Sequence, residues 1–104
     1  MGVKSKGLPT LSGKERIILE RLIESGPKYG LQLVDESRGA LKRGTVYVTL
    51  GRMEQKGLVE SHHEAATPSA DAIPRRMYRA TGLGRRVFDA WTIVARAFAL
   101  ETGR

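Results

Sequence analysis

The sequence predicts one domain of the α+β class that is mostly α. Apolar residues recur at helical spacing in three segments before Gly57. The period then changes, and two short strand candidates flank a loop that contains two prolines. A stripe of large apolar residues finally runs over residues 83–98, as on one face of a long helix. At 104 residues, the chain fits a single domain.

The first helix is predicted over residues 12–25. Ser12 and Glu15 stand three residues apart and form a capping-box signature, in which each side chain bonds the backbone N–H of the other residue. Gly26 and Pro27 end this helix. Its apolar face consists of Ile18, Leu19, Leu22 and Ile23.

A second helix is predicted over residues 28–37 and a third over residues 44–56. Gly57 follows the third helix at the position of a left-handed C-cap, and Leu58 is the expected hydrophobic partner of that cap. The inward face of the third helix consists of Val46, Leu50 and Met53.

A long-looped hairpin is predicted next, with strands over residues 58–64 and 75–80 and a tip over residues 65–74. Thr81 can cap a last helix of about 30 Å, at 1.5 Å per residue. The apolar stripe of this helix consists of Leu83, Val87, Trp91, Val94 and Phe98.

The charge of the chain points to a polyanionic partner. Eighteen Lys and Arg against eleven Asp and Glu give a net charge of +7 and a pI near 10.3. A domain this basic commonly binds nucleic acid, although a basic balance can also serve solubility alone. Cysteine is absent and no apolar run approaches the roughly 20 residues of a membrane span. We expect a cytoplasmic protein without a membrane partner and without a metal or other cofactor.

Three helices followed by a hairpin are the plan of a winged helix-turn-helix, in which the hairpin is the wing. Residues 1–10 are expected to be a flexible basic arm. Residues 11–80 are expected to be a winged helix-turn-helix DNA-binding domain, and residues 81–104 a C-terminal dimerisation helix.

The outward face of the third helix suits the major groove of DNA. Small residues permit close approach, a methyl-bearing side chain contacts thymine, and long Arg or Gln side chains bond base edges. Gly51 costs a helix roughly 1 kcal/mol relative to alanine. Close approach to bases would explain it; so would packing on another helix, or simple tolerance. The residues expected to face bases are Thr45, Tyr47, Val48, Gly51, Arg52 and Gln55.

A second set of residues is expected to contact phosphates, which positions a protein on DNA without reading sequence. Strand alternation sends Arg75 and Arg76 to opposite faces, and Arg75 is preferred because it lies nearer the wing tip. The expected phosphate contacts are Lys28, Tyr29, Lys42, Arg43, Arg75 and Arg76.

Four groups of short fragments stand in a recognisable order. They are Tyr29-Gly30; Gly44-Thr45-Val46-Tyr47 with Thr49-Leu50; Lys56-Gly57-Leu58-Val59-Glu60-Ser61; and Pro74-Arg75-Arg76-Met77-Tyr78-Arg79-Ala80-Thr81 followed by Gly84. In this order and spacing they resemble the PadR family of bacterial transcriptional regulators, over residues 12 to about 90. The chain departs from the family pattern at Val48, Gly51, Ala72 and Ile73.

This resemblance implies a homodimeric winged-helix repressor that binds an inverted repeat in promoter DNA. The third helix would enter the major groove, and the wing would contact the backbone or minor groove. Some members hold flat aromatic ligands between paired tryptophans of the last helix. Trp91 lies about one turn before that tryptophan's usual place, near Ala95, so a structural tryptophan is favoured over a site for a small aromatic effector.

The stripe from Leu83 to Phe98 needs a cover. A helix-to-helix dimer seam is the favoured cover, and packing across the first helix of the same chain is the alternative.

The sequence gives little support for enzyme chemistry. His62 and His63 are adjacent on a predicted strand, so their side chains point to opposite faces and cannot bind one metal ion together. Gly82-Leu83-Gly84 lacks the rest of a phosphate-binding fingerprint. A winged helix that binds RNA or an acidic protein is the rival interpretation, since a fold alone does not decide function.

Overall fold

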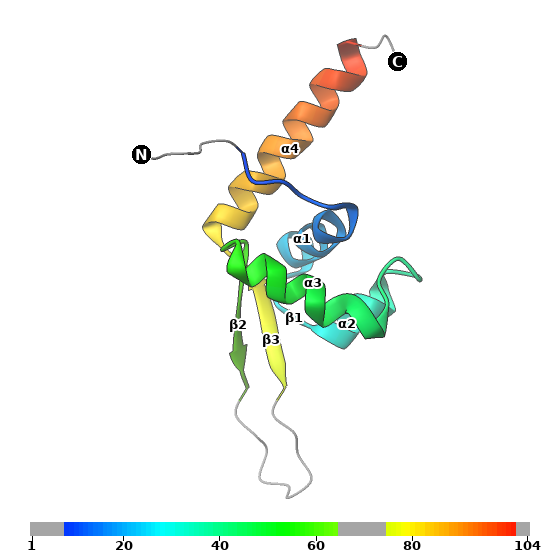
Figure 1. Cartoon of the computed structure of the whole chain (residues 1–104), viewed down its shortest axis with the longest axis vertical. Coiled ribbons are helices and arrows are strands. Elements are labelled where there is room, and N and C mark those ends of the chain that lie inside the picture. Colours follow the sequence, from blue (N-terminus) through cyan, green and yellow to red (C-terminus); the bar gives the residue numbers. More distant parts are fainter. Residues whose placement is uncertain (1–7, 65–74, 102–104) are drawn as a thin grey trace, which may run out of the picture.

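The computed structural model describes residues 8–64 and 75–101 (Figure 1). The expectations on residues 1–7, on the wing tip with Ala72 and Ile73, and on residues 102–104 lie outside this part. The elements are helices α1 (Gly13–Ser25), α2 (Gly30–Glu36), α3 (Arg43–Gln55) and α4 (Gly82–Glu101), and strands β1 (Lys28–Tyr29), β2 (Val59–His63) and β3 (Arg76–Ala80). The winged-helix plan and the mostly helical α+β class are confirmed.

The capping box of α1 is confirmed. The backbone N–H of Ser12 donates to Glu15 Oε1 at 2.9 Å, and the N–H of Glu15 donates to Ser12 Oγ at 3.1 Å. Glu15 also has a partner far along the chain, because Lys56 Nζ lies 2.9 Å from its Oε1. The cap of α1 is thereby tied to the end of α3, which no local pattern predicted.

The helix predicted over residues 28–37 is wrong at its start. Lys28 and Tyr29 form a short strand paired with β3, and α2 begins only at Gly30. The sheet has the order β1-β3-β2, so β1 covers an edge of β3 that a plain hairpin would leave unpaired. Two residues are too few to show a strand period.

The core lies between α1, α3 and the sheet. The inward face of α3 is buried as expected, and Gly57 has φ 78°, in the left-handed region that a C-cap requires. Thr81 caps α4, with Gly84 N donating to Thr81 Oγ1 at 2.9 Å. The fully or almost fully buried apolar residues are Ile18, Leu19, Leu22, Leu33, Leu41, Val46, Leu50, Met53, Leu58, Val59, Tyr78 and Val87.

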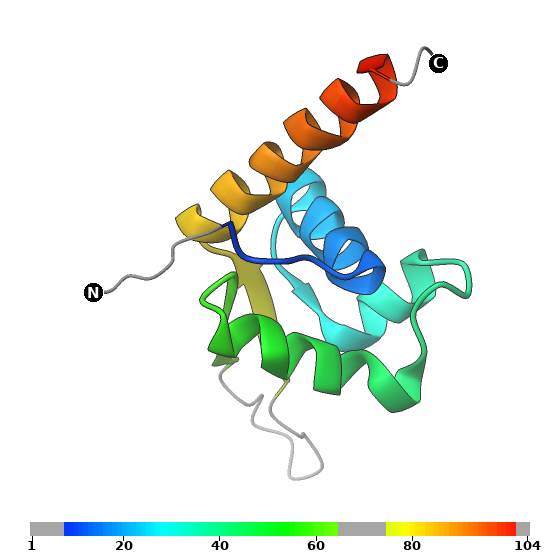
Figure 2. The ribbon, with the colours of Figure 1, turned by 45° about the horizontal axis from the view of Figure 1, so that its top comes forward.

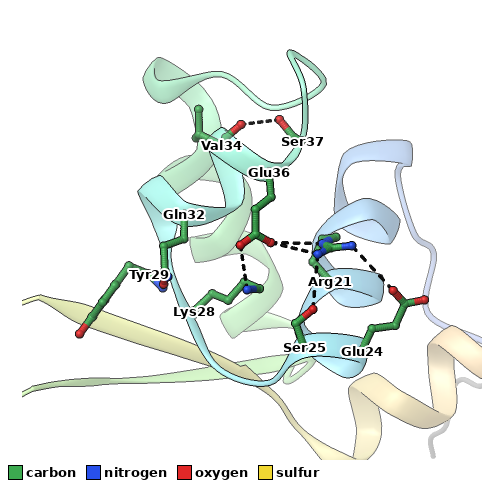
Figure 3. A network of polar contacts seen from close by, with 9 residues as sticks. All are labelled: Arg21, Glu24, Ser25, Lys28, Tyr29, Gln32, Val34, Glu36 and Ser37. Atoms are coloured by element: carbon green, nitrogen blue, oxygen red, sulfur yellow. Dashed lines mark hydrogen bonds and ion pairs between the residues drawn. The ribbon is translucent and has the colours of Figure 1, made fainter.

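A network of charges joins α1, β1 and α2 (Figure 3). Glu36 lies between two cations: Lys28 Nζ is 2.9 Å from its Oε2, and Arg21 Nη2 is 3.1 Å from its Oε1. The hydrogen bond from Lys28 is the main cause that lowers the pKa of Glu36 from its ordinary value.

We expect Glu36→Gln to destabilise the fold at neutral pH but not in acid. A lowered folded-state pKa contributes stability that is present above the unfolded value of about 4.5 and is lost as pH falls through the folded value. Urea unfolding of both proteins between pH 3 and 7 measures this. The difference in unfolding free energy should shrink toward zero in acid; a difference independent of pH would contradict the assignment.

Candidate nucleic-acid interface

The outer face of α3 is open to solvent at the residues expected to read bases. Thr45, Val48, Arg52 and Gln55 are all exposed, and Val48 is among the most exposed apolar residues of the described chain. Figure 2 shows α3 along one border of the molecule, next to the hairpin of β2 and β3. Helix α4 ends on the opposite side from the wing (Figure 1). Helix α3 and the hairpin therefore lie together on the side of the molecule away from the end of α4.

Gly51 has open space in front of it. A Cβ built on Gly51 meets no heavy atom within 4 Å among the described residues, outside its own helix backbone and chain neighbours. No described helix of this chain packs against Gly51, so that explanation of the glycine is wrong. The same openness holds for Gly44 at the start of α3.

Tyr47 is placed differently from the rest of the face. Its ring lies across Gly30, so that a Cβ built on Gly30 would stand 2.6 Å from Tyr47 Cε1 and 2.9 Å from Tyr47 Oη. The phenol thus points to the start of α2 rather than straight outward. A side chain at the border between two helices suits a backbone contact better than a base contact. Only a glycine fits at position 30 beneath this ring, a requirement that depends on where Tyr47 lies in the fold.

Lys28 does not fit its expected role as a phosphate contact. Its side chain is 11% exposed, and its ammonium is engaged by Glu36. A buried charge is kept near its partner, because separating the pair leaves an uncompensated ion. Lys42 and Arg43, at the start of α3, are exposed and remain suited to phosphate.

The base of the wing holds two arginines in different settings. The Arg75 guanidinium carbon lies 5.1 Å from the centre of the Tyr29 ring. Arg76 Nη1 donates to Ser61 Oγ at 3.1 Å, and Arg76 Nη2 lies 2.7 Å from His63 Nε2. Ser61 Oγ in turn donates to Glu54 Oε2 at 2.6 Å, so Arg76 belongs to a chain of contacts that ends on α3. Both arginines are exposed, and the preference for Arg75 stays a prediction.

Tyr29 contacts both sides of the wing base. Its phenol donates to Glu64 Oε1, and this hydrogen bond is the largest cause that raises the pKa of Tyr29. Its ring supports Arg75 on the other strand. The phenol therefore has a carboxylate partner already, which changes the role expected for Tyr29.

Helix α4 is divided between two environments. Its first half packs on α1 and the core, and Val87 is only 2% exposed. Val87 therefore belongs to the monomer core, and its assignment to a dimer seam is wrong. Trp91 Nε1 donates to the carbonyl of Pro9 at 2.7 Å, and its ring packs partly on the core. The alternative of packing across the first helix thus holds for this half.

The second half of α4 extends past the other helices (Figures 1 and 2). Val94 is exposed, Phe98 is 68% exposed and Ile93 is 66% exposed. The predicted stripe missed Ile93, which lies about 100° around the helix from Val94. A broader apolar face than the stripe is therefore uncovered here. Leu83, at the start of α4, is at the border of exposure and lies beside Gly57.

Short helices, a three-stranded sheet with a wing, and an exposed outer face on α3 define a winged helix-turn-helix protein of the DNA-binding class. The model of the Transcriptional regulator PadR-like family matches residues 18–90, so the chain belongs to this family. The resemblance inferred from its fragments is confirmed. It is a family of transcriptional regulators and not of enzymes.

Solved structures agree with this membership. A PadR family transcription regulator from hypervirulent Clostridium difficile R20291 shares 25% identity, with a TM-score of 0.74, over 88% of this chain and 96% of that chain. A PadR family regulator from Eggerthella lenta DSM 2243 shares 26% identity, with a TM-score of 0.68, over 85% and 76%. Bacillus subtilis PadR in complex with operator DNA shares 14% identity and the fold, with a TM-score of 0.63, over 84% and 58%. No curated protein matches the sequence.

No helix within residues 8–64 and 75–101 is long and apolar enough to cross a membrane. No group of three or more His, Cys, Asp or Glu side chains in that part is arranged to hold a metal ion. The cytoplasmic location expected from the sequence stays a prediction.

Proposed function

We propose that the protein is a homodimeric, sequence-specific transcriptional repressor that binds an inverted repeat in promoter DNA. The observation that carries this proposal is the open space in front of Gly51 on α3. A glycine inside a helix lowers helix stability by roughly 1 kcal/mol relative to alanine, and no described neighbour requires one here. Close approach of a partner from outside the chain accounts for it.

The side chains around Gly51 suit the major groove. Val48 offers methyl groups to a thymine, and Arg52 and Gln55 can hydrogen-bond base edges. Thr45, one turn before Val48 and Thr49, completes this base-facing set. Backbone contacts come from residues at the border of the same surface, which are Lys42, Arg43, Tyr47, Arg75 and Arg76.

A homodimer would account for the uncovered half of α4. Fully burying a side chain such as Val94 or Phe98 contributes about 1.5–3 kcal/mol, so two such faces have reason to meet. Two-fold symmetry places the two α3 helices on half-sites about one DNA turn apart, which requires an inverted repeat. Trp91, with its N–H bonded to Pro9, is proposed as a structural residue, and a small aromatic effector at the seam stays a prediction.

The test is binding of the purified protein to its own upstream intergenic DNA and to a shuffled duplex at near-physiological salt. A preference of about a thousandfold or more supports a sequence-specific regulator. Equal and steeply salt-dependent binding to both would contradict it and would favour the rival RNA- or protein-binding module. Reporter transcription with and without the protein then distinguishes repression from activation.

We expect Gly51→Ala to make the protein more stable and its operator binding weaker. Alanine should raise the unfolding free energy by up to about 1 kcal/mol, while its methyl group should lower operator affinity about tenfold, which is roughly 1.4 kcal/mol. Urea unfolding and a binding titration measure the two effects. Gly13→Ala in α1 is the control and should leave binding unchanged, because a Cβ there also meets no atom of the described part of the chain within 4 Å. Unchanged binding in both variants would remove Gly51 from the interface.

A further inference from the structure

The two residues that flank the wing tip, Glu64 and Arg75, are held together at its base. The N–H of Glu64 donates to the carbonyl of Arg75 at 2.8 Å, next to the last paired residues, His63 and Arg76. This backbone bond makes the two side chains neighbours across the hairpin. A carboxylate and a guanidinium in such neighbouring positions can form a direct ion pair. Such a pair would occupy the charge that a phosphate contact needs.

Tyr29 stands between these two side chains. Its phenol donates to Glu64 Oε1, while the Arg75 guanidinium lies over its ring at 5.1 Å from the centre. The carboxylate therefore has a partner other than Arg75. A guanidinium held over an aromatic ring can still donate hydrogen bonds to an anion through the N–H groups that point away from the ring.

The body of the protein holds Tyr29 in place. Its backbone pairs with Met77 of β3, and its N–H donates to Gln32 Oε1 at 2.8 Å. The ring is thus anchored between the sheet and α2, independently of the wing tip. The wing base is built against this ring.

We infer that Tyr29 is a positioning residue, which separates Glu64 from Arg75 and presents the Arg75 guanidinium to a DNA phosphate. This assignment replaces the expected direct contact between Tyr29 and phosphate. It rests on the proposed function only in that the partner is duplex DNA, since a phosphate contact needs no base sequence. Without the tyrosine, Arg75 turns to Glu64 and its charge is lost to the interface.

The test is the salt dependence of binding to a random duplex, measured for the wild type, Arg75→Ala, Tyr29→Leu, Tyr29→Phe, Glu64→Gln and the double variant Tyr29→Leu/Glu64→Gln. Each lost phosphate contact lowers the slope of log K against log salt by about 0.9. We expect Tyr29→Leu to lower the slope by the same amount as Arg75→Ala. Tyr29→Phe keeps the ring but frees Glu64, so its effect should lie between those of Tyr29→Leu and the wild type.

The double variant separates positioning from a general structural effect. Glu64→Gln removes a negative charge and should strengthen binding slightly in any background. We expect a larger gain in the Tyr29→Leu background, by about threefold or more, because only there does Glu64 compete for Arg75. Equal gains in both backgrounds, or an unchanged slope in Tyr29→Leu, would overturn the inference.

A wild-type protein that binds operator and shuffled DNA equally overturns sequence-specific regulation, yet the slopes on random duplex still decide the role of Tyr29. A wild-type protein that binds no duplex at all overturns both.

Discussion

Gly84→Ala is expected to lower the free energy of unfolding by about 3 kcal/mol, the upper end for overpacking a tightly packed position. A Cβ on Gly84 would stand 2.1 Å from the carbonyl oxygen of Leu58 and 3.2 Å from Leu19 Cδ2. The carbonyl cannot turn away cheaply, because it also accepts the N–H of Thr81 at 3.0 Å. The start of α4 would have to move away from the connection between α3 and β2.

Urea unfolding followed by circular dichroism measures this effect. Gly82→Ala is the matched control, because among the described residues a Cβ there meets only Arg86 Nη1 at 3.6 Å, the far end of a flexible side chain. The control should unfold at nearly the same urea concentration as the wild type. Equal stability of the two variants would show that α4 tolerates a shift at this crossing.

The second large effect is expected from Phe98→Asp, which should make the protein monomeric and weaken operator binding by about a hundredfold or more. Phe98 is 68% exposed, so its replacement removes little from the fold of one chain. A carboxylate buried in an apolar seam would be strongly unfavourable without a partner. A monomer binds only one half-site and loses the gain from linking two.

Sedimentation equilibrium at micromolar protein and an operator titration measure the two consequences. Arg96→Gln is the control, since it changes the net charge by the same amount and lies about 160° around α4 from Phe98. This control should remain dimeric and should bind the operator nearly as the wild type does. A Phe98→Asp protein that is still a dimer would place the seam elsewhere, and a monomeric wild type would reject the dimer.

Elements with a strong local signature were predicted well. Ser12 and Glu15 signal the start of α1, Gly57 signals the end of α3, and Thr81 signals the start of α4; each acts on backbone groups within one turn of itself. The buried face of α3 was equally readable, because helical spacing alone decides which of its residues share a side. The order of helices, the wing and the family resemblance follow from such patterns.

Residue roles that depend on distant neighbours were not readable in the same way. The sequence predicts Lys28 as a phosphate contact, but in the fold its ammonium lies beside Glu36. The sequence predicts Val87 as part of a dimer seam, but the fold buries it in the core of one chain. The predicted stripe leaves out Ile93, because this residue lies beside the stripe. Its exposure becomes evident only in the fold, where no described element covers this half of α4.

The candidate interface shows the same division. The residue types and spacing of α3 were enough to select Val48, Gly51 and Arg52 as an outward face, because that face depends only on the turn of one helix. The positions of Tyr47 over Gly30 and of Tyr29 between Glu64 and Arg75 depend on tertiary structure. Those contacts join segments many residues apart, and their energy depends on distance and burial, which no local period encodes.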